Sequence, residues 1–244
     1  MKINKFDLIA HSFGAFLCCH YIDQYKPNVG RVFLCSPAGF TRLEKGQFDN
    51  IYKNLNMIEK HLYHTCMQEK KICVFEAIPP WMKKIYIDNW LNNPILKLCP
   101  MEKLYLKKLF HVIITLKTSY ETAACYLLEY GSYSSLPISS VIKSVGDHCK
   151  VHIYYGDIDW MDYKSACKYL GDKKIDIEVE MIANSGHVFM LENPFGLLEK
   201  IFTAYLSKES RTQPKPVVYD NILTCLDLND SNMFSPDDPK EKKK

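Results

Sequence analysis

Three side chains that can together activate a serine occur in this chain in the order serine, aspartate, histidine. Ser12 stands in an H-S-F-G motif, Asp159 in Y-G-D-I-D, and His187 in S-G-H. A serine hydroxyl becomes a good nucleophile when a histidine takes its proton and a carboxylate orients that histidine. The three residues in this order predict attack on an acyl group through a covalent acyl-serine.

Ser12 lies between two elements that can position it. The run from Phe6 to Ala10 is mostly apolar and predicts a strand, and the residues after the motif are apolar at helical spacing to about Tyr25. A serine between a strand and a helix is the context of a nucleophile elbow, with small residues, Ala10 and Gly14, two positions to either side. The alternative is that Ser12 only caps the helix. An elbow would offer the backbone N–H of Phe13 to an oxyanion.

Asp159 and His187 each follow a segment that predicts a strand. Residues 150–155 precede the first, and the alternating segment 175–182 precedes the second. Because ligand sites in parallel sheets form at the carboxyl ends of strands, we expect the three side chains to meet there. Asp157 and Asp162 crowd the loop of Asp159 and are more typical of turn or helix caps. His11 is expected to support the elbow while pointing away from the histidine base.

The order of elements predicts an α/β fold with an open, mostly parallel sheet. Strand, helix and strand follow one another at the start of the chain, and the same alternation returns near its end. Between them, mixed charged and aromatic residues, cut by prolines at 79, 80, 94 and 100, predict short helices. We therefore expect a first part of the core at 1–40, a helical insertion at 41–140, a second part of the core at 141–207 and a flexible tail at 208–244.

Composition excludes several classes of function. The net charge of the 244 residues is +3, too small to predict nucleic-acid binding. The ten cysteines form no C-x-x-C pair and no Cys/His cluster with zinc-ligand spacing, so neither a metal nor another cofactor is expected. No stretch predicts a membrane span or a signal peptide, which favours an intracellular protein in the cytoplasm or at a membrane surface.

Five stretches carry a resemblance to the α/β-hydrolase superfamily and, within it, to the α/β-hydrolase-domain 4/5 subfamily. They are H-S-F-G-A-F-L (11–17), S-P-A-G-F (36–40), S-Y-E-T-A (119–123), Y-G-D-I-D-W-M-D (155–162) and S-G-H-V-F-M-L-E-N-P (185–194). The resemblance implies an α/β-hydrolase fold with a helical cap, and makes Ser12 the nucleophile, Asp159 the acid and His187 the base. It also implies a lipid or lysophospholipid partner, on membranes, lipid droplets or mitochondria.

Two features depart from the family pattern. The subfamily's H-x-x-x-x-D motif, linked to lysophosphatidate acyl transfer, has Glu192 in place of its aspartate. The elbow strand begins at residue 6, whereas about four strands, with a second oxyanion-hole donor, usually precede it. Loss of one such donor typically costs about 2.7–4 kcal/mol of transition-state stabilisation. The chain is therefore expected to be a truncated gene model or fragment, with a short pseudoenzyme as the alternative.

These residues predict a serine hydrolase that cleaves acyl esters of lipids or (lyso)phospholipids through Ser12, Asp159 and His187. One alternative is a non-catalytic protein of lipid surfaces that regulates a lipase, or an inactive fragment. Another is a lysophosphatidate acyltransferase.

Overall fold

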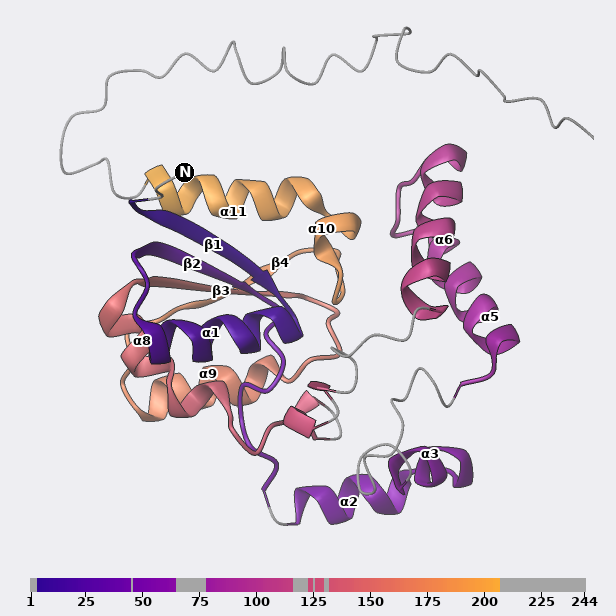
Figure 1. Ribbon diagram of the computed structural model, residues 1–244, viewed down its shortest axis with the longest axis horizontal. Helices are drawn as coiled ribbons and strands as arrows, with labels where there is room; N and C mark the ends of the chain where they lie inside the picture. The colour runs from indigo at the N-terminus through magenta and orange to yellow at the C-terminus, as the bar shows by residue number, and fades with distance from the viewer. Residues whose placement is uncertain are drawn as a thin grey trace, which may run out of the picture. The chain divides into compact units, whose positions relative to one another are not determined.

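A four-stranded parallel sheet forms the centre of the protein (Figure 1). The computed structural model describes residues 4–44, 46–64, 78–115, 123–124, 126–129 and 132–206. The strands lie side by side in chain order: β1 (Phe6–His11), β2 (Val29–Cys35), β3 (Lys150–Gly156) and β4 (Val179–Ile182). Every neighbouring pair is parallel, so the predicted α/β fold with a parallel sheet is confirmed.

Side chains of the sheet alternate between two packed faces, as the pleat requires. One face of the sheet packs against three helices and buries Leu34, Ile153 and Tyr155. Those helices are α1 (Phe13–Tyr25), α8 (Ile142–His148) and α9 (Tyr163–Asp172), which lie together on one side of the sheet in Figure 1. Parallel strands buried on both faces read as continuous apolar runs, which is why β2 and β3 are visible in the sequence.

The opposite face of the sheet is aromatic. Phe33 and His152 stack with ring centroids 5.0 Å apart, and Phe33 also stacks on the buried Tyr154. The Tyr154 hydroxyl donates a hydrogen bond of 3.4 Å to the carbonyl of Lys200 in α11 (Pro194–Leu206). Helix α11 therefore covers this face, beyond the short helix α10 (Phe189–Glu192) (Figure 1).

Two local expectations were wrong. The alternation at 175–182 predicts a strand of eight residues, but β4 begins only at Val179. The N–H groups of Ile175 and Ile177 donate instead to the carbonyls of Leu170 and Ile175, so a turn uses the donors that a ladder would need. Helix α8 was not predicted, because it is seven residues long and contains a glycine.

The segment between the two parts of the core contains helices, as expected. Among the residues that the structure describes, they include α2 (Gln47–Asn54), α3 (Met57–Leu62), α5 (Pro80–Leu91) and α6 (Pro100–Thr115), followed by a 3₁₀ turn at Ile138–Ser140. Helices α5 and α6 pack on each other, with the rings of Trp90 and Phe110 edge to face at 5.0 Å. An isolated antiparallel bridge between Leu128 and Ser134 was not expected. The predicted tail at 208–244 lies outside the described residues.

The helices in the described ranges are all too short or too polar to cross a membrane. The buried cysteines include Cys19 and Cys35, which are free thiols. Burial raises the pKa of the Cys35 thiol to about 12, so this side chain packs as a small apolar group.

Candidate active site

Ser12 occupies a strained turn between β1 and α1. Its backbone has φ 54° and ψ −121°, a conformation that residues other than glycine rarely adopt. The turn is held on both sides, because the Ser12 N–H donates to the Cys35 carbonyl at 2.9 Å and the Ser12 carbonyl accepts from the N–H of Ala15 and of Ala38. Strain that is maintained by surrounding hydrogen bonds is typical of a functional turn.

Gly14, the small residue two positions after Ser12, has open space around it. A Cβ added to Gly14 would meet no atom of the described residues within 4 Å. The small residue at this position therefore does not relieve a visible clash, although the strained serine that it was expected to flank is present.

His187 connects Ser12 to Asp159. Its Nε2 lies 2.9 Å from the Ser12 Oγ, and its Nδ1 lies 3.3 Å from the Asp159 Oδ1. A carboxylate can only accept, so the imidazole carries its proton on Nδ1 and leaves Nε2 to accept from the serine hydroxyl. The structure thus brings together the three residues that the sequence analysis selected, and this tautomer is the one in which the imidazole can remove the serine proton.

Asp159 is the most enclosed of the three side chains. Its carboxylate is 0% exposed, against 16% for the His187 side chain. Burial alone would raise the pKa of the carboxyl. Hydrogen bonds from His187, from the Ser36 hydroxyl and from the Met161 N–H outweigh it, and the pKa is lowered below its usual value. Asp159 is therefore held as an anion beside the imidazole.

Ser36 is a residue of this site that the sequence analysis did not single out. It follows β2, is fully buried, has φ 43°, and donates its hydroxyl to the Asp159 Oδ2. Its N–H donates to the Tyr154 carbonyl at 2.7 Å, which fixes it between β2 and β3. A polar residue directly after a buried strand, next to the elbow strand, was the available signal.

The loop that carries His187 is fastened by two other carboxylates. Asp157 accepts the N–H groups of Asn184 and Ser185 at 2.9 and 3.0 Å, and these bonds, that of Ser185 first, lower its pKa. Glu192 accepts the N–H of Gly186 at 2.5 Å. The loop before the imidazole is therefore tied both to the end of β3 and to α10.

His11 lies against His187, contrary to expectation. Its Nε2–H donates to the His187 carbonyl at 2.8 Å, and the two rings are 4.7 Å apart. Burial lowers the pKa of His11, which keeps the ring neutral against its neighbour. The side chain at the end of β1 therefore supports the base loop, and does not point away from it.

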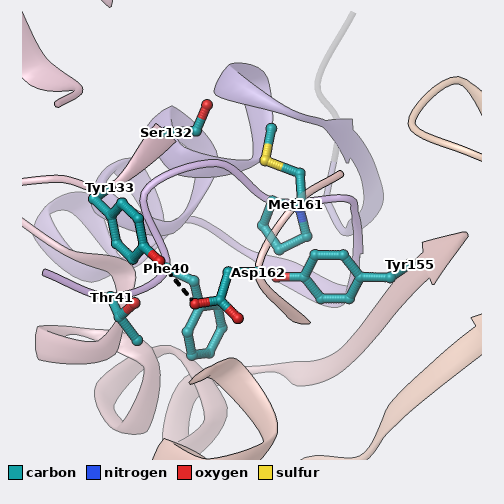
Figure 2. A pocket seen from close by; sticks show the side chains of 8 residues that line it. Phe40, Thr41, Ser132, Tyr133, Tyr155, Met161 and Asp162 are labelled. Carbon is teal, nitrogen blue, oxygen red and sulfur yellow. Dashed lines mark hydrogen bonds between the residues drawn. The ribbon is translucent and has the colours of Figure 1, made fainter. Parts of the chain in front are cut away.

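Asp162 caps the helix after the acid loop, as predicted. It accepts the Ser165 N–H at 3.1 Å and the Tyr133 hydroxyl at 2.9 Å, the bond dashed in Figure 2. A small cavity of about 10 Å³ lies beside this pair. Its lining comprises Pro37, Phe40, Thr41, Ser132, Tyr133, Tyr155, Met161 and Asp162. Since neither Ser12 nor His187 lines it, the cavity is behind the acid loop and is not an acyl site.

Solved structures share this arrangement of strands and helices. The carboxylesterase CesB of Bacillus subtilis superposes with a TM-score of 0.54 at 15% identity, over 84% of this chain and 61% of that one. The chain has the α/β-hydrolase fold. At this identity the α/β-hydrolase likeness concerns the fold alone. No protein-family model matches the sequence.

Curated relatives of this α/β-hydrolase-fold chain are distant. A probable 1-acylglycerol-3-phosphate O-acyltransferase of rice is 23% identical over 213 residues, which is 83% of this chain and 50% of the relative. The abhydrolase domain-containing protein abhd-5.2 of Caenorhabditis elegans is 21% identical over 191 residues, which is 77% of this chain and 40% of the relative. The chain thus spans about half the length of the curated relatives that it matches.

Proposed function

We propose that this protein is a serine hydrolase that cleaves acyl esters of lipids or (lyso)phospholipids. The observation that carries the proposal is the continuous hydrogen-bonded series Ser12–His187–Asp159 at the carboxyl ends of β1, β4 and β3. In this reading Ser12 is the nucleophile, His187 the general base and Asp159 the acid that orients it. The strained backbone of Ser12 supports the first assignment.

Acylation would begin with proton transfer from the Ser12 hydroxyl to Nε2 of His187. The Ser12 Oγ forms a bond to the ester carbonyl carbon, whose π electrons move to its oxygen. The anion Asp159 stabilises the imidazolium that results. The imidazolium then gives its proton to the departing alcohol oxygen as the carbon–oxygen bond breaks, which leaves an acyl-serine.

Deacylation would repeat these steps with water in place of the serine. His187 takes a proton from water, the hydroxide oxygen attacks the acyl carbon, and Ser12 leaves with the proton returned by the imidazole. In both halves the N–H of Phe13 is the proposed donor to the oxyanion. It is the first residue of α1, where an N–H has no partner within the helix.

The lipid substrate and the subfamily are supported by relatives. The rice and Arabidopsis thaliana proteins carry names of acyltransferases that act on a lysophospholipid, and the nematode protein carries an abhydrolase-domain name. We place the chain near the α/β-hydrolase-domain 4/5 subfamily on the same motifs. Residues 41–140 would form the cap over the acyl chain, and substrate would come from a membrane or lipid-droplet surface.

Acyl transfer is the second candidate, because three relatives bear the name 1-acylglycerol-3-phosphate O-acyltransferase, one with the qualifier "probable". The acyl-serine could pass its acyl group to the free hydroxyl of a lysophosphatidate as well as to water. Glu192 is the residue at the family's motif position. Its carboxylate accepts the Gly186 N–H at 2.5 Å, which supports a role in holding the base loop in either reaction.

Product analysis tests both candidates. The full chain is incubated with lysophosphatidate and lysophosphatidylcholine, with and without acyl-CoA, alongside Ser12→Ala. A hydrolase releases fatty acid from the lysolipids in a Ser12-dependent manner without acyl-CoA. Formation of phosphatidate that requires acyl-CoA and Ser12 favours the transferase. Absence of Ser12-dependent turnover in all arms contradicts both and favours a non-catalytic protein.

A further inference from the structure

Helices α5 and α6 hold an excess of positive charge. Residues 78–115 contain six lysines, against two carboxylates, a net charge of +4. Because the whole chain carries +3, all its other residues together carry −1. Both carboxylates are engaged within the pair: Asp88 pairs with Lys107, and Glu102 accepts the N–H of Cys99. The remaining lysines give this element a positive surface.

The same two helices expose large apolar side chains at helical spacing. Trp81, Ile85 and Tyr86 of α5 are 64%, 51% and 66% exposed, and Leu104, Tyr105 and Leu109 of α6 are 46%, 56% and 52% exposed. Meanwhile Ile87 and Leu91 are buried, so the pair has its own small core. A helix surface that mixes aromatic and aliphatic side chains with lysines is typical of elements that lie in a membrane interface.

Between the helices is a groove of about 360 Å³ with lysines among its lining residues. It is lined by Lys84, Lys107, Lys108 and His111 over the apolar Ile87 and Leu104. Lys84 and Lys108 are exposed, one on each helix. Because Lys107 is paired with Asp88, Lys84 and Lys108 are the lysines that this groove can offer to a phosphate group. Ile87 and Leu104 give an apolar floor to the glycerol and acyl portions attached to it.

We propose that the α5–α6 pair binds the surface of a bilayer that contains anionic phospholipid. Charge complementarity selects this occupant. A neutral lipid surface would leave the lysines without partners, while a soluble phosphate would leave Trp81, Tyr86 and Tyr105 in water. Lys84 and Lys108 contact lipid phosphates, and the exposed aromatic rings insert at the level of the headgroups. The proposal deepens the lipid hydrolase function proposed above by naming where substrate surface is met, but the binding itself does not require catalysis.

Co-sedimentation with vesicles tests this surface. The full chain carrying Ser12→Ala is mixed with vesicles of phosphatidylcholine alone or of phosphatidylcholine with phosphatidylserine. We expect binding to the anionic vesicles that weakens with added salt. The double variant Lys84→Gln/Lys108→Gln should weaken it by about 25-fold, since one lysine near an anionic surface contributes about fivefold. Trp81→Ala should weaken binding to the same vesicles without changing its salt dependence.

The matched control is Lys164→Gln/Lys168→Gln, two exposed lysines one turn apart on α9. It removes the same charge from another surface and should leave binding within about twofold. Equal loss in both double variants, equal binding to neutral and anionic vesicles, or binding of short-chain phosphatidate without vesicle binding would overturn the proposal. Hydrolysis of a soluble short-chain ester by the lysine variants, with Ser12 intact, reports separately on the catalytic function.

Discussion

The proposed acid depends on three donors that meet one buried carboxylate. An ionised carboxyl in a site without water is costly unless each of its oxygens is hydrogen-bonded. Asp159 accepts from His187 and the Met161 N–H on Oδ1, and from Ser36 on Oδ2. Together these bonds keep its pKa lowered despite burial. The orientation of His187 therefore depends on a residue, Ser36, that takes no part in bond breaking.

Ser36→Ala should lower kcat for ester hydrolysis by about tenfold or more, with KM little changed. A hydrogen bond to a charged group contributes about 1.5–3 kcal/mol, and without it the carboxylate can turn away from the imidazole. Ser36→Gly is the matched variant, because it removes the same hydroxyl but tolerates φ 43°. Both variants should lose activity equally, as measured by steady-state kinetics. A loss in the alanine variant alone would point to backbone strain instead.

His11 makes the stability of the fold sensitive to mild acid. Burial lowers its pKa from 6.5, so below pH 6.5 the unfolded chain binds a proton at His11 that the folded chain does not. The free energy of unfolding therefore falls as the pH decreases below 6.5. Above pH 6.5 the full contribution of the neutral His11 to stability is present. His11→Gln, which keeps an N–H donor, should reduce the slope of the curve, while His152, whose pKa burial also lowers, retains part of it. Urea unfolding between about pH 5 and pH 8 measures this, and parallel curves for the two proteins would contradict it.

At the scale of elements, the end of β3 and the loop of His187 are packed backbone against backbone. A Cβ on Gly156 would lie 2.2 Å from the Ser185 carbonyl oxygen and 2.3 Å from that of Gly186. Only a glycine lets the strand that precedes Asp159 approach the loop that precedes the imidazole so closely. The distance between acid and base is thus set by backbone contact as well as by side chains.

Gly156→Ala should destabilise the fold by about 1–3 kcal/mol, the usual cost of overpacking, and should reduce activity by separating Asp159 from His187. Gly171→Ala is the control, since a Cβ there meets no atom of the described residues within 4 Å and the position lies inside α9. It should stabilise the protein by about 0.5–1 kcal/mol. Chemical denaturation and ester hydrolysis, measured on both variants, check the pair. Similar effects at the two positions would show that the close approach is unimportant.

At the scale of the whole molecule, the elbow strand β1 is an outer strand of the described sheet. It pairs with β2 on one side, and Ile9 at its centre is 61% exposed. The side chains on either side of Ile9, Leu8 and Ala10, point to the opposite face of the strand and pack on the core. An outer strand with an exposed apolar residue is a favourable place for another strand to pair.

Pairing of β1 between two copies of the chain would produce concentration-dependent self-association, and Ile9→Lys should reduce it, because a lysine on an outer strand discourages edge-to-edge pairing. Sedimentation velocity at several concentrations provides the measurement. The fold itself should be retained, since the Ile9 side chain is largely in solvent. Unchanged association would mean that this edge does not pair between copies.

The sequence predicts the parts of this structure in which local pattern and tertiary packing agree. Strands β1 to β3 and helix α11 were visible because their buried apolar runs are bounded by polar or proline-containing turns. Ser12 and Asp159 were recognisable because each follows such a run, and His187 because it follows the alternating segment 175–182. Ser36 and His11 were not assigned their roles, since a contact between residues 123 apart, or 176 apart, leaves no local pattern. The start of β4 at Val179 and the short helix α8 depend on packing rather than on periodicity.

Mapping the adduct of a fluorophosphonate probe tests the proposed nucleophile most directly. The full chain is treated with the probe at neutral pH, digested, and analysed by peptide mass spectrometry. We expect one adduct, on Ser12, absent in Ser12→Ala and formed at least about a thousandfold more slowly in His187→Ala. An adduct on another residue, labelling that survives Ser12→Ala, or no labelling of the folded protein would contradict the assignment of Ser12, His187 and Asp159.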